Sequence, residues 1–255
     1  MTTIRPYYAE KGLSAAFYDT VTAADVRLIG DLEIYAGLLK APASILELGS
    51  GTGRLALALA ARGFSVTGIE IAPAMLAQAQ AKRGELDPET QRRVEFRRGD
   101  MTAVDLKRRF DLVLCAYFTL AHVPRGAAWK NTFDTAARHL DSGGLAAFHL
   151  PLVEVMRLSG PASLDLPVLD EPAPTGGRIQ LFVRERTFRE EVGRLDQVLE
   201  YVELDGRGQT LRSSFEKLTY YWTEPKPFAE AAGFTPDRAP ILLGGIGEIW
   251  VFRKA

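Results

Sequence analysis

Cysteine is almost absent from this chain of 255 residues, in which Cys115 is the only one. A single cysteine cannot form an internal disulfide, and a metal site built from several cysteines is excluded. The three histidines, His122, His139 and His149, show no HExxH or comparable metal-binding spacing. The sequence therefore predicts no metal site.

A surplus of charge is also missing, because 31 Lys and Arg residues are offset by 32 Asp and Glu residues, for a net charge of −1. Nucleic-acid-binding proteins usually carry a clear basic surplus, so no nucleic-acid partner is expected. Local basic runs do occur at Arg92-Arg93, Arg97-Arg98 and Lys107-Arg108-Arg109. A solvated edge of a sheet explains these runs, and an RNA-facing patch is the alternative.

Long hydrophobic runs are missing as well. No stretch of the chain reaches the roughly 18 apolar residues that a membrane-spanning helix needs, and residues 1–6 do not read as a signal peptide. These two absences predict a soluble, cytoplasmic protein with no membrane partner.

Glycine is concentrated in one informative stretch. The apolar run 45–48 meets glycine at positions 49, 51 and 53, and a helix-prone run follows that stops at Gly63. A strand, a glycine turn and a helix can bring the backbone close to a nucleotide-like ligand, since glycine has no Cβ and the helix start offers unpaired N–H groups. A dinucleotide fingerprint, G-x-G-x-x-G/A, would need Gly or Ala where this sequence has Arg54.

The pattern E-x-G-x-G-x-G instead resembles the first motif of the class I methyltransferases that depend on S-adenosylmethionine (SAM). The resemblance implies that SAM is the cofactor and that the motif contacts it through the following residues: Glu47, Gly49, Ser50, Gly51 and Gly53. The next strand, 65–70, ends at Glu70, 21 residues after Gly49. A carboxylate there can accept hydrogen bonds from both ribose hydroxyls, and it would repel the 2′-phosphate of NADP.

Three further segments extend the resemblance to the cofactor. The resemblance implies that Ile71 packs on adenine and that Met75 contacts the cofactor, with burial in the core as the alternative for Met75. Gly99-Asp100-Met101 resembles the turn at which the family recognises adenine, through the Asp100 carboxylate and the Met101 N–H; an Asp that caps its own turn is the alternative. Phe17-Tyr18-Asp19 resembles an F-Y-D element in which the tyrosine covers the methionine end of the cofactor, and ordinary packing is the alternative for Tyr18.

The candidate catalytic residues follow two later strands. The apolar run 110–115 suits a strand covered on both faces, and its exit places Ala116 to His122 beside the reacting centre. Ala116, the first of these residues, is expected to contact the cofactor. This exit resembles a signature of small-molecule methyltransferases, from which it departs by having Phe118 where Asn is common. His122 matches the histidine of that signature and could take a proton from a nucleophile, or it could be structural. With Tyr117, and with His149 at the end of strand 145–150 where it should face the cleft, it forms the predicted catalytic cluster. Contact with the core or with solvent is the alternative for His149.

We predict an α/β fold, in which a Rossmann-like sheet of seven strands has helices on both faces and a small antiparallel sheet is inserted. The predicted ranges are 1–40 for an N-terminal helical lid, 41–150 for the SAM-binding core, 151–222 for the insertion and 223–255 for the last helix and strands of the core. Segment 25–39 predicts a helix. Within the insertion, the proline-rich segment 160–177 predicts a long loop, and the segments 178–188, 194–204 and 209–222 predict three strands.

The expected activity is transfer of a methyl group from SAM to an N or O atom of a small molecule, because the insertion would enclose a modest acceptor. One alternative is a methyltransferase that acts on protein or RNA, and another is a SAM-binding protein without turnover. The absence of an N-P-P-Y or D-P-P-Y element argues against base methylation. An NAD-dependent oxidoreductase is a further alternative, against which Arg54 argues. The oligomeric state is left open, and a homodimer is allowed.

Overall fold

The chain divides into two compact units. The computed structural model describes residues 3–158, 160 and 165–255. Unit 1 consists of Met1–Val26 and Val153–Tyr221, and unit 2 consists of Arg27–Leu152 and Trp222–Ala255. Each unit contains its own β-sheet.

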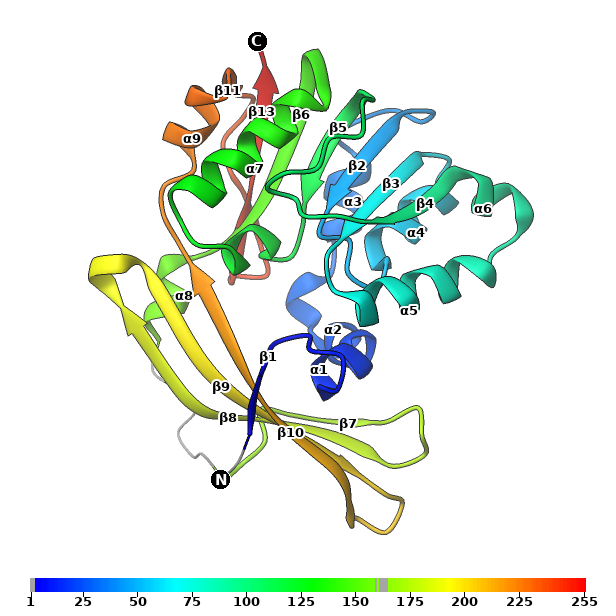
Figure 1. Cartoon of the computed structure of the whole chain (residues 1–255), viewed down its shortest axis with the longest axis vertical. Coiled ribbons are helices and arrows are strands. Elements are labelled where there is room, and N and C mark those ends of the chain that lie inside the picture. The colour runs from blue at the N-terminus through cyan, green and yellow to red at the C-terminus, as the bar shows by residue number, and fades with distance from the viewer. Residues whose placement is uncertain (1–2, 159, 161–164) are drawn as a thin grey trace. The chain divides into compact units, whose positions relative to one another are not determined.

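Unit 2 is built on a mostly parallel sheet with the strand order β11-β13-β6-β5-β2-β3-β4, and β12 pairs with β13 (Figure 1). Strands β2 to β6 run parallel, and β13 runs antiparallel to β6. The order reverses beside β2, and open α/β sheets bind ligands at such a point, outside the carboxyl ends of the strands. The strands are β2 (Ser44–Leu48), β3 (Ser65–Glu70), β4 (Val94–Arg98), β5 (Phe110–Cys115), β6 (Leu140–Pro151), β11 (Phe234–Pro236), β12 (Ile241–Leu243) and β13 (Gly247–Lys254).

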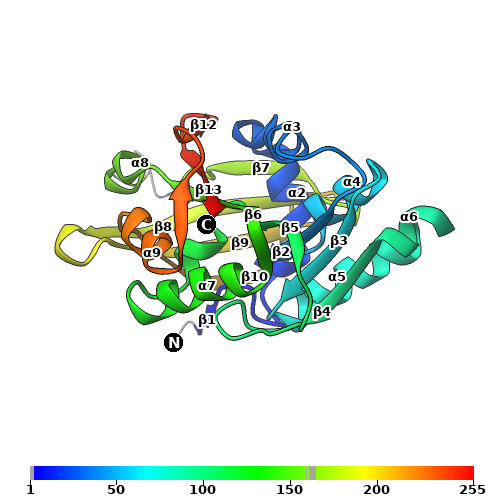
Figure 2. The same ribbon diagram turned by 90° about the horizontal axis from the view of Figure 1, so that it is seen from above.

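Helices cover both faces of this sheet, with α3 and α4 on one side and α7 and α9 on the other (Figure 2). Successive residues of β2 point to opposite faces, so Ile45 packs with α4 while Leu46 and Leu48 pack with α7. Burial on both faces explains why the strands read as continuous hydrophobic runs. The helical segments are η1 (Val26–Leu28), α3 (Asp31–Ala36), α4 (Arg54–Ala61), α5 (Pro73–Gly84), α6 (Pro88–Arg93), η2 (Thr119–His122), α7 (Ala127–Arg138) and α9 (Lys226–Ala231).

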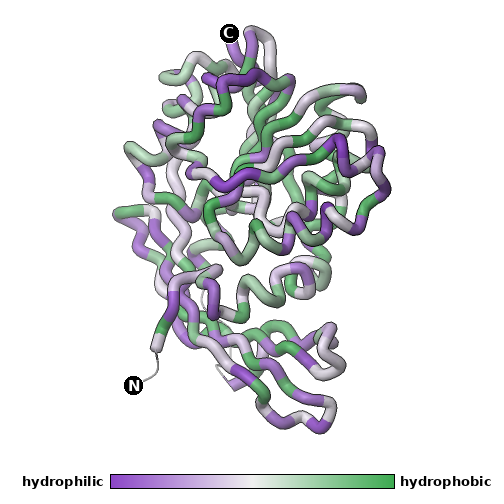
Figure 3. The backbone as a smooth tube through the Cα atoms, turned by 45° about the vertical axis from the view of Figure 1, so that its right-hand side comes forward, coloured by the Kyte–Doolittle hydropathy of each residue, from purple (hydrophilic) through white to green (hydrophobic). Residues whose placement is uncertain are grey.

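Unit 1 is built on a five-stranded sheet with the order β1-β10-β9-β8-β7, antiparallel except for β1, which runs parallel to β10. Buried and half-buried residues alternate along β9, and hydrophilic and hydrophobic segments alternate along this part of the backbone (Figure 3). This alternation is typical of a sheet with one covered face. The strands are β1 (Ile4–Pro6), β7 (Leu169–Pro172), β8 (Arg178–Arg189), β9 (Arg194–Leu204) and β10 (Thr210–Tyr221).

A buried carboxylate holds the N-terminal residues on the sheet of unit 1. Glu216 on β10 is completely buried and accepts a hydrogen bond from the Ser14 N–H at 3.1 Å. The Leu13 N–H donates to the Ser214 hydroxyl at 3.1 Å, so the first N–H groups of α1 have side-chain acceptors. The helical segments of this unit are α1 (Leu13–Ala16), α2 (Tyr18–Ala24), α8 (Val153–Arg157) and η3 (Glu190–Val192).

The predicted fold class is confirmed, because the main sheet contains the expected seven strands and a second, antiparallel sheet is present. The three strands predicted in the insertion are β8, β9 and β10. Several details were wrong. The second sheet has five strands, since the N-terminal segment contributes β1 and the second part of the predicted proline loop contributes β7; residues 161–164 of that loop lie outside the described residues. Strand β12 adds an eighth member to the main sheet, and the predicted helix 25–39 is interrupted at Gly30, whose φ is +97°.

Candidate active site

The glycine stretch forms a tight loop between β2 and α4. Gly49, Gly51 and Gly53 adopt φ values of +70°, +56° and +81°, in the left-handed region that favours glycine. Close packing adds a second reason for glycine at position 49, because a Cβ there would lie 2.1 Å from the Cγ2 atom of Thr119. The loop therefore needs glycine for its backbone shape and for the close approach of a neighbouring segment.

Glu70 joins this loop to the end of the neighbouring strand β3. Its carboxylate accepts a hydrogen bond from the Gly51 N–H and another from the Ala72 N–H, each at 2.8 Å. The side chain is 8% exposed, so these two bonds are made largely out of water. A carboxylate has room for about four hydrogen bonds. The loop thus fixes the orientation of a carboxylate that can accept further donors.

The residues predicted to hold adenine lie at the ends of β3 and β4. Ile71 directly follows Glu70 and is 59% exposed, which leaves an apolar side chain available to cover a flat ring. Asp100 accepts hydrogen bonds from the N–H and the hydroxyl of Thr102, both through Oδ1 and both at 2.8 Å, so it caps its own turn. Met75 and Met101 are buried, at 1% and 9% exposed. Their predicted cofactor contacts stay predictions, and core packing accounts for their side chains.

Glu47 lies at the end of β2 with its carboxyl group out of water. The side chain is 3% exposed, and burial raises the pKa of this carboxyl group to about 8. Among the described residues, its Oε2 atom has no hydrogen-bond partner. A buried polar atom in that state marks a place where a donor from a ligand or from water could bind.

An ion pair that the sequence did not predict acts on Glu47. Arg54, the first residue of α4, donates to both carboxylate oxygens of Asp31, the first residue of α3, and one of these contacts is 3.2 Å long. Arg54 stands where a dinucleotide-binding fingerprint needs Gly or Ala. The sequence shows the departure at position 54, but a partner 23 residues away gives no local signal.

The segment after β5 has a strained backbone. Tyr117 and Phe118 adopt φ values of +44° and +62°, which large side chains rarely do. The turn carries η2 back over the glycine loop, where Thr119 meets Gly49. Such strain is found most often at functional sites. It supports the prediction that the segment from Ala116 to His122 belongs to the reacting centre.

The two candidate histidines are in apolar surroundings. Burial lowers the pKa of both His122 and His149 to about 4, so both imidazoles are neutral at pH 7. The side chain of His149, for which core contact was the alternative to facing the cleft, is completely buried, with its ring centroid 4.6 Å from that of Phe118. His149 points to the same face of β6 as Leu145 and Ala147, which are buried in the core. The catalytic roles of Tyr117, His122 and His149 stay predictions.

Tyr18 begins α2 in unit 1, whereas the other predicted cofactor residues belong to unit 2. Its ring lies edge-on to that of Tyr8, with the centroids 5.8 Å apart. This contact is ordinary packing within unit 1, and the predicted role of Tyr18 over the cofactor stays a prediction.

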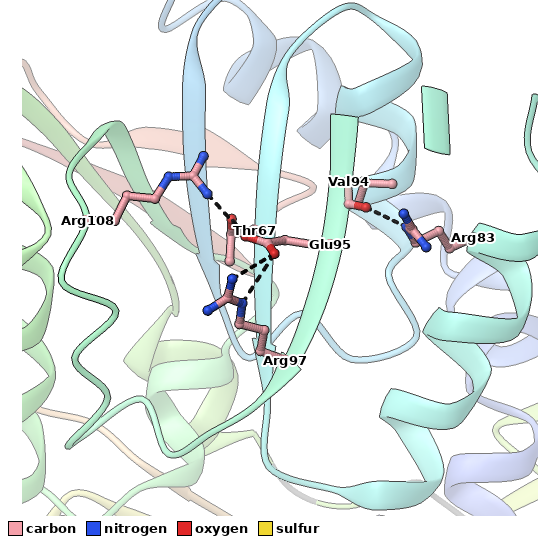
Figure 4. A network of polar contacts seen from close by, with 6 residues as sticks. All are labelled: Thr67, Arg83, Val94, Glu95, Arg97 and Arg108. Atoms are coloured by element: carbon pink, nitrogen blue, oxygen red, sulfur yellow. Dashed lines mark hydrogen bonds and ion pairs between the residues drawn. The ribbon is translucent and has the colours of Figure 1, made fainter. Parts of the chain in front are cut away.

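The basic runs lie around the edge strand β4, and acidic side chains pair with several of them. Glu95 accepts hydrogen bonds from Thr67, Arg97 and Arg108 at 2.9, 2.9 and 3.1 Å (Figure 4). Lys107 pairs with Asp105, and Arg93 pairs with Glu89. This arrangement favours a solvated sheet edge over a surface that offers unpaired cations to RNA.

The sheet and the glycine loop of unit 2 are similar to those of a known protein family. Residues 45–144 match a family model described as a methyltransferase domain. This segment is similar to a methyltransferase domain. The predicted resemblance is thereby confirmed for the part of the chain that carries the glycine loop, Glu70 and β5.

Known relatives of the methyltransferase domain cover a limited part of the chain. A protein of Geobacillus sp. (strain WCH70), GWCH70_2453, provisionally named a methyltransferase, is 36% identical over 104 residues, which are 41% of this chain and 40% of that protein. The chain therefore matches less than half the length of this relative.

Solved methyltransferase structures share the fold over nearly the whole chain. DesVI of Streptomyces venezuelae superposes with a TM-score of 0.77 at 16% identity, over 94% of this chain and 98% of that one. CalS10 of Micromonospora echinaspora, titled an amino pentose methyltransferase, superposes with a TM-score of 0.61 at 24% identity, over 94% and 95% of the two chains. Because each alignment covers 94% of this chain, each includes residues of the second, antiparallel sheet.

None of the helices described is long and apolar enough to cross a membrane. No group of three or more His, Cys, Asp or Glu side chains in the described part of the chain is arranged to hold a metal ion.

Proposed function

We propose that this chain transfers a methyl group from SAM to a nitrogen or oxygen atom of a small molecule. The observation that carries the proposal is the Glu70 carboxylate, fixed by the Gly51 and Ala72 N–H groups beside exposed Ile71. In this proposal the carboxylate accepts hydrogen bonds from the ribose hydroxyls, and Ile71 covers one face of the adenine. Glu47 lies at the other end of the loop, towards the methionine part of the cofactor.

SAM, when bound, supplies a methyl group that its positively charged sulfur has already activated. The task of the chain is then to hold the acceptor in line with this methyl group and to keep water away, which can contribute roughly 7–11 kcal/mol. An amine or hydroxyl acceptor must also lose a proton. A neutral imidazole can accept that proton, and the low pKa of His122, about 4, keeps its ring neutral across the working pH range.

Nitrogen is the acceptor atom that we favour. CalS10 is titled an amino pentose methyltransferase, and another structural neighbour, MtfA, is titled a glycopeptide N-methyltransferase. These names belong to those proteins and support a search among small amines first. Action on RNA is less favoured, because acidic side chains pair with several of the basic residues around β4. The cytoplasmic location and the homodimer remain predictions from the sequence.

Binding and turnover are tested separately. Titration calorimetry should show binding of SAM and of S-adenosylhomocysteine (SAH), and no binding of NAD at the same concentrations. Transfer of tritiated methyl groups should then label members of a panel of small amines and alcohols. Binding of NAD without binding of SAM or SAH would overturn the assignment of SAM as the cofactor. Label found only in protein or RNA fractions would overturn the small-molecule acceptor.

A further inference from the structure

A layer of buried polar groups lies on the α3 and α4 face of the main sheet, directly behind the glycine loop. Glu47 on β2 is paired in register with Leu114 on β5, and Leu114 with Ala147 on β6. Side chains two residues apart on a strand share a face, so Ala116 and His149 point to the same side as Glu47.

Unpartnered atoms are concentrated in this layer. Among the described residues, six buried side-chain atoms have no hydrogen-bond partner, and four of them are Glu47 Oε2, the Tyr35 hydroxyl and both ring nitrogens of His149. Tyr35 lies one helical turn after Asp31 on α3, so the two side chains share one face of that helix. Buried polar groups are normally satisfied, so this layer is incomplete until donors and acceptors from a ligand or from water enter it.

The Arg54–Asp31 ion pair contributes the fixed charges beside Glu47. Both residues occupy the first position of a helix, where the backbone carries a partial positive charge. That position favours Asp31 and disfavours Arg54. Asp31 is 4% exposed, so its carboxylate is largely out of water. The charges of the pair therefore act on neighbouring groups with little screening by solvent.

We propose that the Arg54–Asp31 pair controls whether Glu47 carries a charge, and that charged Glu47 holds the cationic ammonium group of the cofactor. The inference rests on the proposed function, since it takes SAM as the ligand. It assigns Arg54 and Asp31 as positioning residues that act through Glu47 and touch no ligand themselves. It predicts that the affinity for the cofactor depends on pH. It also predicts that removing Arg54 and removing Asp31 shift the pH midpoint of this dependence in opposite directions.

The charges around Glu47 fit this role. Burial is the main cause that raises its pKa to about 8; Arg54 opposes the rise, while Asp31 and Glu70 add to it. The titratable groups that interact electrostatically with this carboxyl group are Arg54 from α4, Asp31 and Tyr35 from α3, Glu70 from β3 and Cys115 from β5. His149 from β6 interacts with Arg54 and Asp31. At pH 7 the carboxyl group is mostly protonated, and raising the pH towards 8 creates the anion that a cationic ligand needs.

The first test measures ligand affinity by calorimetry between pH 6 and pH 9. SAM and SAH both carry the ammonium group, whereas 5′-methylthioadenosine carries only the adenosyl end. Affinity for SAM and for SAH should rise by up to about tenfold per pH unit towards pH 8, as Glu47 loses its proton, and fall again above pH 8, where the ammonium group of the ligand loses its own proton. Affinity for 5′-methylthioadenosine should stay flat. Glu47→Gln should remove the pH dependence and leave the affinity for 5′-methylthioadenosine unchanged.

Single substitutions in the pair should move the midpoint in opposite directions. Arg54→Met removes the favourable charge and should raise the midpoint by about one pH unit. Asp31→Asn leaves Arg54 to act on Glu47 and should lower the midpoint. Arg54→Lys keeps the charge and should stay close to the parent protein. The double variant Asp31→Asn with Arg54→Met leaves no unpaired charge, and its midpoint should fall between those of Arg54→Met and the parent protein.

A matched control is available on the same two helices. Arg62 and Glu33 also join α4 to α3, but this ion pair is exposed. Arg62→Met should leave the midpoint unchanged. A purely structural role for Arg54–Asp31 would weaken all three ligands alike and shift no midpoint, which would overturn the inference. Binding of SAM without any pH dependence would overturn the inference and leave the proposed function intact, whereas no binding of any adenosyl ligand at any pH would overturn the proposed function itself.

Discussion

The Glu70 carboxylate and the Gly51 N–H lie 2.8 Å apart and tie the tip of β3 to the glycine loop after β2. This bond makes the two parts of the proposed cofactor site one structure, because the same carboxylate that shapes the loop is the proposed acceptor for the ribose hydroxyls. The loop in turn gives Glu70 a fixed orientation before a ligand arrives. Preorganisation of this kind lowers the entropy lost on binding.

Glu70→Ala should therefore weaken SAM and SAH alike. Two charge-assisted hydrogen bonds to a ribose contribute roughly 1.5–3 kcal/mol each, so the dissociation constant should rise by about 100-fold or more. Glu95→Ala is a matched control on the neighbouring strand, because Glu95 bonds only to Thr67, Arg97 and Arg108 among the contacts described here. Calorimetry should show unchanged binding for Glu95→Ala. Equal binding by Glu70→Ala and the parent protein would remove Glu70 from the site.

Gly49→Ala should destabilise the fold more than Gly30→Ala. Both glycines have positive φ values, +70° and +97°, so alanine costs roughly 1–2 kcal/mol of backbone strain at either position. A Cβ at position 49 would also collide with Thr119, whereas a Cβ at position 30 meets nothing within 4 Å. Overpacking adds about 1–3 kcal/mol to the first variant only. Urea unfolding measures the difference.

A second substitution tests the cause of that difference. Thr119→Ser removes the Cγ2 methyl group that a Cβ at position 49 would meet. The double variant Gly49→Ala with Thr119→Ser should regain most of the stability that Gly49→Ala loses beyond the loss in Gly30→Ala. No recovery would show that the collision with Thr119 is not the reason for glycine at this position.

Much of this architecture could be predicted because local patterns determine it. The glycine turn, the acidic end of β3 and the period-two alternation of β8 to β10 each depend on neighbouring residues, and the structure has them where the sequence placed them. Strands β1 and β7 could not be predicted in this way. Each is only three or four residues long and is defined by its pairing with a distant strand, Ile4 with Phe215 and Leu169 with Leu181.

The candidate site divides in the same way. Glu70 and the three glycines could be predicted from their spacing in the sequence. The Arg54–Asp31 pair could not, because it depends on how α3 packs beside α4 and no local sequence pattern indicates that packing. The sequence left open whether His149 faces the cleft or the core for a related reason. The end of a strand suggests exposure, but β6 continues to Pro151 and places residue 149 well inside it.

Stability should fall as the pH falls from 6.5 towards 4. The pKa values of His122, His139 and His149 are all lowered in the folded protein, in each case mainly by burial. The unfolded chain therefore binds more protons in this range, so the stability present above pH 6.5 is lost as the pH decreases. For His149, a shift from 6.5 to about 4 corresponds to at most about 3 kcal/mol.

Two histidine variants separate the causes of this acid sensitivity. His149→Leu removes two buried nitrogens without partners and should flatten the pH dependence while leaving stability at pH 8 nearly unchanged. His139 bonds to the Leu106 N–H through Nε2 at 2.9 Å and to the Thr135 carbonyl through Nδ1 at 2.7 Å. His139→Leu leaves both backbone groups without this partner, which should lower the free energy of unfolding by about 1–3 kcal/mol at every pH. Thermal unfolding between pH 4 and pH 8 measures both. An unchanged acid transition in His149→Leu would show that His149 is not protonated on unfolding in this range.

Kinetics should distinguish the two histidines as proton acceptors. His122 is only half-buried, whereas His149 is completely buried, so His122 is the one that an acceptor molecule can reach. If His122 takes the proton, His122→Asn should lower kcat by about 100-fold or more and leave the affinity for SAM unchanged. Because its pKa is about 4, the kcat of the parent protein should stay level from pH 8 down to about pH 5 and fall only below that. His149→Leu should keep most of its activity, and the reverse pattern would assign the proton to His149 and require this segment to open during turnover.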